Sequence, residues 1–119
     1  MPHAEHLPLR VLTLESEAMI SVAIEAALCG AGYAVESATT GRRALTLLDA
    51  RQFDAALVAI GLQSGDSRLV AEALSLKHIP YAFCTAGDIV EAHFINVPVL
   101  DKPFSDGALL AVVSRLVLQ

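Results

Sequence analysis

Four short segments of this 119-residue chain hold the side chains that could do chemistry. They read LESE (14–17), AIGLQSGDS (59–67), CTAG (84–87) and LDKPF (100–104). Carboxylates can bind a divalent cation or act as nucleophiles, and the ammonium group of Lys102 could neutralise an anion. Each segment follows a short apolar run, so the four would meet at one edge if those runs are parallel strands of one sheet.

Five short apolar runs predict the strands that would position these segments, at 9–14, 33–37, 55–60, 80–85 and 97–100. The first, third and fourth runs are almost continuously apolar rather than alternating, which is typical of strands buried on both faces. Apolar residues recur with helical spacing over 17–29, 41–51 and 105–118. Ser16, Thr40 and Ser105 are the expected N-caps of these three helices.

The alternation of strands and helices predicts an α/β domain whose parallel sheet is covered on both faces. In so short a chain, the flavodoxin-like strand order 2-1-3-4-5 is favoured over a six-stranded dinucleotide-binding fold. Neither GxGxxG nor GxxxxGKS/T follows a predicted strand, which argues against a phosphate-cradling nucleotide site. We expect residues 1–119 to form one domain, with a flexible segment at 1–7.

The composition limits the possible functions. An apolar content of 55% with a net charge of −5 argues against a disordered chain and against a nucleic-acid-binding surface. No apolar run reaches the roughly 18 residues of a membrane span, and the N-terminus lacks the apolar region of a signal peptide. A cytoplasmic protein is therefore expected. Cys29 and Cys84 lack metal-ligand spacing and are expected to be small buried side chains.

The order of the motifs along nearly the whole chain resembles the receiver domain of bacterial response regulators. An acidic turn follows the first strand, FDAALVAIGL takes the place of the third, Thr85-Ala86 ends the fourth, and Lys102-Pro103-Phe104 follows the fifth. The segment 61–87 also resembles a branch of that family common in alphaproteobacteria, with a short connection between the fourth and fifth strands.

The resemblance implies a set of site residues. Receivers phosphorylate an Asp at the end of the third strand; two acids hold Mg²⁺, a hydroxyl contacts the phosphoryl group, and a Lys neutralises its charge. The second acid and the acceptor are both replaced here, by a serine and an alanine. A methyl group cannot form an acyl phosphate. The acidic pair corresponds to Glu15 and Ser16, and the acceptor corresponds to Ala59. The hydroxyl is that of Thr85, and the lysine is Lys102.

We therefore expect no enzymatic activity and no resident cofactor. Glu15 with the carbonyl of Gly61 is a poor Mg²⁺ cage, and Glu15 is expected to pair with Lys102 instead. Two independent losses favour natural degeneration over an engineered replacement at Ala59. The open alternative is a phosphorylatable receiver whose acceptor was mutated or is unconventional, with Ser16, Glu15 or Asp66 in that role.

The signalling surfaces also depart from the family pattern. Val99 stands where active receivers carry a switching aromatic, and the short connection leaves room only for a helix near Asp88–Phe94. By contrast, the first and last helices are apolar most of the way round, which implies a covering partner. The candidate interaction residues are Met19, Val22, Ala26, Cys29, Leu110, Ala111 and Leu118.

These observations predict a stand-alone pseudo-receiver without an appended output domain. It would act by phosphorylation-independent contact with a sensor histidine kinase, a phosphotransfer protein or another response regulator. A homodimer through the first and last helices, or a purely structural dimerisation module, are the other interpretations. No nucleic-acid or membrane partner is expected.

Overall fold

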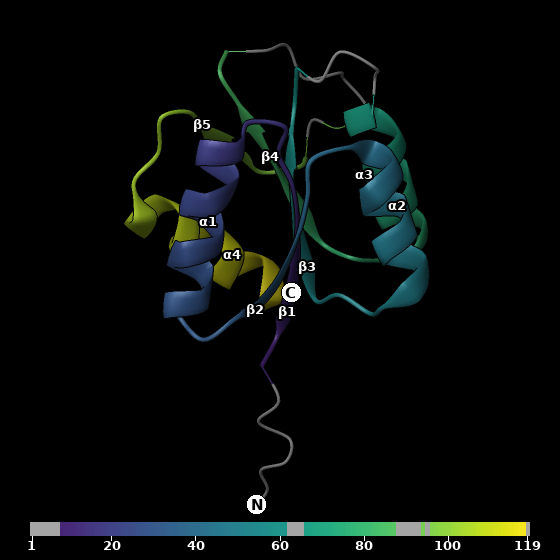
Figure 1. The fold of residues 1–119 in the computed structure, drawn as a ribbon, viewed down its shortest axis with the longest axis horizontal. Coiled ribbons are helices and arrows are strands. Elements are labelled where there is room, and N and C mark those ends of the chain that lie inside the picture. Colours follow the sequence, from purple (N-terminus) through teal and green to yellow (C-terminus); the bar gives the residue numbers. More distant parts are fainter. Residues whose placement is uncertain (1–7, 62–65, 88–93, 95, 119) are drawn as a thin grey trace, which may run out of the picture.

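The sheet has five parallel strands in the order β2-β1-β3-β4-β5 (Figure 1). The computed structural model describes residues 8–61, 66–87, 94 and 96–118. The predicted flavodoxin-like order is therefore confirmed, and each strand lies within two residues of its predicted bounds. The strands are β1 (Arg10–Leu14), β2 (Ala34–Ala38), β3 (Ala55–Ala59), β4 (Tyr81–Thr85) and β5 (Val99–Asp101).

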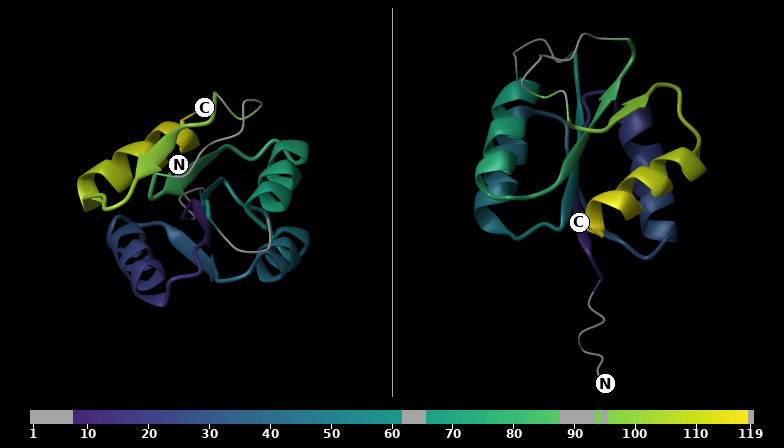
Figure 2. Two further views of the ribbon diagram at one scale, coloured as in Figure 1. Left: turned by 90° about the horizontal axis from the view of Figure 1, so that it is seen from above. Right: turned by 180° about the vertical axis from the view of Figure 1, so that it is seen from behind.

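In the described residues, four helices cover the two faces of the sheet in pairs (Figure 2). One face carries the first and last helices, and the other carries the middle two. The bounds are α1 (Ala18–Gly30), α2 (Gly41–Ala50), α3 (Asp66–Leu76) and α4 (Asp106–Val117). None of these helices, within the described part of the chain, is long and apolar enough to cross a membrane.

The central strands form the core because both of their faces are apolar. Every residue of β3 and β4 is buried, as are the last four residues of β1. β2 is only half-buried, and β5 is a three-residue edge strand. The continuous apolar runs thus identified the strands that are packed between two helical layers.

Two of the three predicted N-caps are confirmed. The hydroxyl of Thr40 accepts a hydrogen bond from the backbone N–H of Arg43 at 3.2 Å, and that of Ser105 accepts one from Ala108 at 3.0 Å. The prediction for Ser16 was wrong, because α1 begins at Ala18 with Glu17 as N-cap and no side-chain cap bond.

The segment between β4 and β5 is described only in part. The short helix predicted near Asp88–Phe94 lies outside the described residues, except for Phe94 itself. The Phe94 ring is buried and packs edge-on against Phe83 of β4, with ring centroids 5.3 Å apart. The predicted flexible segment at 1–7 also lies outside the described residues.

Candidate functional site

The carboxyl ends of four strands meet at one edge of the sheet. The registers align Leu14 of β1 with Val58 of β3, Ala59 with Cys84 of β4, and Thr85 with Asp101 of β5. The residues at or just after these ends therefore become neighbours although they are far apart in sequence. This edge holds Glu15, Ala59, Thr85 and Lys102, whereas Ser16 lies exposed in the turn before α1.

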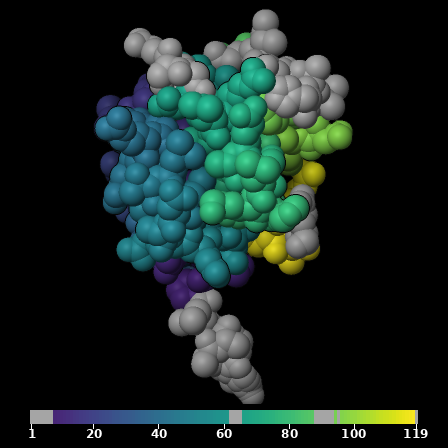
Figure 3. All heavy atoms as spheres, turned by 90° about the vertical axis from the view of Figure 1, so that its right-hand side faces the viewer, coloured from purple at the N-terminus to yellow at the C-terminus, as the bar shows by residue number. Residues whose placement is uncertain are grey.

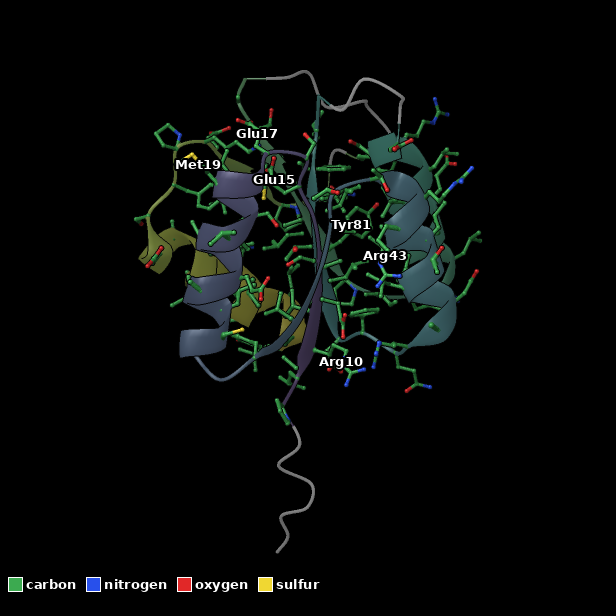
Figure 4. The ribbon with its side chains drawn as sticks, viewed as in Figure 1. Arg10, Glu15, Glu17, Met19, Arg43 and Tyr81 are labelled. Atoms are coloured by element: carbon green, nitrogen blue, oxygen red, sulfur yellow. The ribbon has the colours of Figure 1, made fainter. Side chains whose placement is uncertain are left out.

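A buried ion pair dominates this edge. The Nζ of Lys102 lies 2.7 Å from Oε1 of Glu15, and the two side chains are only 13% and 2% exposed. The other Glu15 oxygen, Oε2, accepts a hydrogen bond from the backbone N–H of Glu17 at 3.0 Å. Figure 4 shows Glu15 and Glu17 at the junction of β1 and α1. Both oxygens of the buried carboxylate are thus engaged, which offsets the cost of removing its charge from water.

The carboxylate of Glu17 is a second, weaker neighbour of the same ammonium group. Its Oε1 lies 3.9 Å from Nζ of Lys102, and its side chain is largely exposed. Exposed ion pairs at this distance contribute little to stability. Among the described residues, the edge therefore sets one buried acid, Glu15, against one partly buried base, Lys102.

The end of β3 presents a methyl group at this edge. Ala59 is buried, and its carbonyl oxygen accepts a hydrogen bond from the hydroxyl of Ser67 in the first turn of α3. The following Ile60 donates its N–H to the carbonyl of Cys84 at 2.9 Å, and Gly61 then turns the chain with φ +93°. Residue 59 therefore contributes no side-chain oxygen to the edge.

Asp66 is engaged elsewhere. Its Oδ2 accepts a hydrogen bond from the backbone N–H of Gly41 at 2.9 Å, which joins the first turns of α2 and α3. A Cβ at position 41 would lie 2.5 Å from Cβ and Cγ of Asp66, so only glycine fits there. Sequence reasoning missed this contact, since the glycine directly after the Thr40 cap was its only local signal.

The two cysteines lie in contrasting environments. Cys84 is buried beside the edge, and desolvation raises the pKa of its thiol to about 12; Lys102 lowers that pKa in part, and Glu15 raises it further. Cys29 is exposed, so the expectation that both are buried was wrong for this residue. It lies on the outer side of α1, which the sheet does not cover.

Alkylation of the native protein at pH 8 should modify Cys29 and leave Cys84 intact. A thiol with a pKa near 12 is almost wholly protonated at that pH, and burial also blocks access to the reagent. Intact mass after iodoacetamide treatment should show one adduct in the native protein and two after denaturation. Two adducts without denaturation would contradict the burial of Cys84.

The described carboxylates near this edge are engaged with other groups. Within the described ranges, no three or more His, Cys, Asp or Glu side chains are placed to hold a metal ion together. The carboxylate of Glu15 already contacts an ammonium group, and Asp66 bonds to Gly41.

An apolar groove of about 520 Å³ lies next to Lys102. It runs between the first turns of α1 and the segment that joins β5 to α4, with Ile20, Ile24, Phe104 and Leu109 among its lining residues. In Figure 4, Met19 lies on the side of α1 that faces this segment.

The predicted interaction residues lie together on the α1 and α4 side of the sheet, and most are exposed. Met19 is 87% exposed and Val22 67%. Leu110 differs, since it is half-buried and packs against the core beneath α4. The exposed members of the set are Met19, Val22, Ala26, Cys29, Ala111 and Leu118.

Solved structures of receiver domains have the same fold. The signal receiver domain of the LuxO repressor protein from Vibrio parahaemolyticus is 18% identical, over 94% of this chain and 92% of that one, with a TM-score of 0.83. A response regulator receiver protein from Burkholderia phymatum is 22% identical, over 92% and 94%, with a TM-score of 0.80. At these identities the likeness defines the fold, a receiver-type α/β domain.

A closer likeness in sequence is to SdrG from Sphingomonas melonis Fr1. It is 31% identical over 92% of this chain and 96% of SdrG, with a TM-score of 0.80. No family model and no curated protein matches the chain. The chain belongs to the family of response-regulator receiver domains, which gives it a role in two-component signalling.

Proposed function

We propose that this chain is a receiver that signals by protein–protein contact without being phosphorylated. One observation carries the proposal: at the edge where receivers do their chemistry, the end of β3 presents the methyl group of Ala59, and Glu15 already holds the ammonium group of Lys102 at 2.7 Å. The nucleophile is lacking and the cationic group is already paired.

The first argument against phosphorylation is the chemistry of the residue that would accept the phosphoryl group. An acyl phosphate forms when a carboxylate oxygen attacks phosphorus, and a methyl group has no lone pair for that attack. The alternative acceptors are poorly placed. Glu15 is buried and ion-paired, Asp66 bonds to the first amide of α2, and Ser16 is an exposed hydroxyl in the turn before α1.

The second support concerns Mg²⁺, which the family implies at this edge. The residues present do not fit it. Mg²⁺ requires near-octahedral oxygen coordination, usually with one or two carboxylates. Among the described residues of this edge, Glu15 is the only buried carboxylate, and a cation would have to displace the ammonium group of Lys102 from it. Glu15 and the carbonyl of Gly61 would together supply too few ligands for Mg²⁺.

An internal ammonium group therefore takes the electrostatic role of a bound cation. Without phosphorylation no charge is added at this edge, so we expect the surface that it supports to keep one conformation. Val99 is exposed on the edge strand β5 and has no aromatic ring that could swing inward. We infer that the chain offers a constant surface to a cytoplasmic partner: a sensor histidine kinase, a phosphotransfer protein or another response regulator. The α1 and α4 side is the proposed contact, and no enzymatic activity is required.

Incubation with acetyl phosphate and Mg²⁺, followed by intact mass measurement, tests this proposal. We expect no gain of a phosphoryl group and no Mg²⁺-dependent rise in melting temperature. SdrG has a BeF3-activated conformation and is the matched positive control. NMR spectra of SdrG should change with BeF3, and those of this chain should not. A phosphoryl adduct on any residue would favour the alternative of an unconventional acceptor.

A further inference from the structure

We infer that the ion pair between Glu15 and Lys102 holds the two walls of the neighbouring apolar groove at a fixed separation. Both are then positioning residues for the α1 and α4 side of the sheet, whose shape they set from beneath. The inference rests on the proposed function, since it names what fixes the form of the surface that a partner contacts. It is carried by the places where the two charged groups are attached to the chain.

One wall of the groove is the first part of α1, and Glu15 is bonded to its start. Oε2 of Glu15 accepts the backbone N–H of Glu17, the N-cap residue, at 3.0 Å. The carbonyl oxygen of Glu17 accepts in turn the N–H of Ser21 at 2.9 Å, and this bond opens the helix. Met19 and Ile20, which line the groove, belong to this turn. A displacement of the Glu15 carboxylate therefore displaces this wall.

The other wall is the segment that joins β5 to α4, and Lys102 is its first residue. The backbone N–H of Lys102 donates to the carbonyl oxygen of Thr85 at 2.7 Å, which fixes the start of this wall to the end of β4. Pro103 and Phe104 follow directly and line the groove, and Ser105 then caps α4. Figure 1 shows this segment beside the start of α1. The side chain of Lys102 thus leaves the chain where the second wall begins.

The sheet joins these two walls only through two intervening strands. β1 and β5 are separated by β3 and β4, and a spacing of about 4.8 Å per strand places them about 14 Å apart. The side chains of Glu15 and Lys102 cross this distance from opposite sides and meet at 2.7 Å. At the ends of β3 and β4, the aligned residues Ala59 and Cys84 are small and buried, which leaves room for the crossing. The pair is therefore a direct link between the ends of two strands that are not neighbours.

The rest of the groove lining is mostly apolar and sets no precise distance. Apolar surface comes from Ile20, Ile24, Phe104 and Leu109. Attraction between such side chains has no preferred direction, whereas a charge-assisted hydrogen bond of 2.7 Å has a defined length and direction. Because the charged side chains are only 2% and 13% exposed, salt screens their attraction less than that of an exposed pair. We therefore expect the pair to determine the width of the groove.

Hydrogen–deuterium exchange of the full chain carrying Lys102→Met tests the inference. Methionine keeps an unbranched side chain but cannot pair with Glu15. Amides in peptides covering 17–24 and 104–109, the two walls, should exchange at least about tenfold faster than in the unaltered chain, because local opening no longer breaks the pair. Amides of α2 and α3, on the face shown in Figure 3, should keep their exchange rates.

Two control variants address other causes of faster exchange. Leu74→Ala lowers stability by leaving a cavity in the core cluster on the opposite side of the sheet. It should not speed exchange in the walls of the groove more than it does elsewhere. Arg51→Met removes a different ion pair, the exposed contact of Arg51 with Glu36 at 3.4 Å, and should leave exchange in both walls unchanged.

Glu15→Leu combined with Lys102→Met separates positioning from stability. This double variant leaves no buried charge at the edge of the sheet and should unfold at a higher urea concentration than Lys102→Met alone. Since it also lacks the pair, both walls should still exchange at least about tenfold faster than in the unaltered chain. Slow exchange that returns together with the stability would overturn the inference. So would equal acceleration in all four helices of Lys102→Met, or unchanged exchange in its walls.

The proposed function is judged by a different measurement, the uptake of a phosphoryl group from acetyl phosphate. A chain that takes none, with walls that Lys102→Met leaves unchanged, would support the proposed function and reject the inference. A chain that is phosphorylated, with walls that Lys102→Met loosens, would reject the proposed function and leave the pair as the element that sets the groove.

Discussion

Lys102→Met should lower the free energy of unfolding by about 3 kcal/mol. The substitution removes the ammonium group that lies 2.7 Å from Oε1 of Glu15 and leaves a carboxylate, 2% exposed, without its counter-charge. Loss of one partner from a buried ion pair costs about 3–5 kcal/mol, and the 13% exposure of Lys102 places this case at the lower end. Urea denaturation followed by far-UV circular dichroism measures the change.

Two variants separate this effect from a general loss of lysine. Lys77→Met changes an exposed lysine just after α3 and should cost less than about 0.5 kcal/mol. Glu15→Leu combined with Lys102→Met removes both charges, and it should be more stable than Lys102→Met alone because no charge remains buried. If Lys102→Met costs no more than Lys77→Met, the ion pair does not stabilise the fold.

Restoring two carboxylates should convert the chain into a metal-dependent receiver. Ser16→Asp together with Ala59→Asp places two acids beside Glu15. Two unit charges 4 Å apart repel each other by about 4 kcal/mol at an effective dielectric constant of 20. Without Mg²⁺ the double variant should therefore be less stable than the unaltered chain by about 3 kcal/mol. Acetyl phosphate with Mg²⁺ should add one phosphoryl group to residue 59.

Mg²⁺ should recover part of the lost stability. At ten times its dissociation constant, a ligand that binds only the folded state contributes about 1.4 kcal/mol. Thermal melts with and without Mg²⁺ measure this gain, and intact mass reports the phosphoryl group. The pair Ser16→Asn and Ala59→Asn has nearly the same shapes without the charges, so its melts should not respond to Mg²⁺. A double Asp variant that ignores Mg²⁺ would mean that the site lacks more than two carboxylates.

The sequence by itself determined the architecture, because the signals for it are local. Continuous apolar runs identify strands such as 55–60, and the spacing of Ile20, Ile24 and Leu28 identifies a helix with one buried side. Strand–helix alternation with right-handed crossovers then leaves few topologies for so short a chain. The predicted parallel strands also place the residues at their carboxyl ends, including Ala59, on one edge of the sheet.

Contacts between segments that are distant in the sequence could be identified only from the tertiary structure. The bond from Gly41 to Asp66 depends on how closely two helices approach, and no periodicity reports that distance. The start of α1 depends on the buried carboxylate of Glu15, which accepts the N–H of Glu17 and left the predicted Ser16 cap without a role. The exposure of Cys29 depends on which side of α1 the sheet covers, and an apolar sequence all round the helix does not reveal that side.

The pairing of Glu15 with Lys102 depends both on the order of residues in the sequence and on the tertiary structure. The resemblance predicted that an acid and a base lie at the same edge of the sheet. Only the packing of the strands sets their separation at 2.7 Å and buries the carboxylate. Residue type and order along the chain are enough to say which groups can meet at a sheet edge. How strongly they interact depends on distance and burial, which arise from side-chain packing across the whole domain.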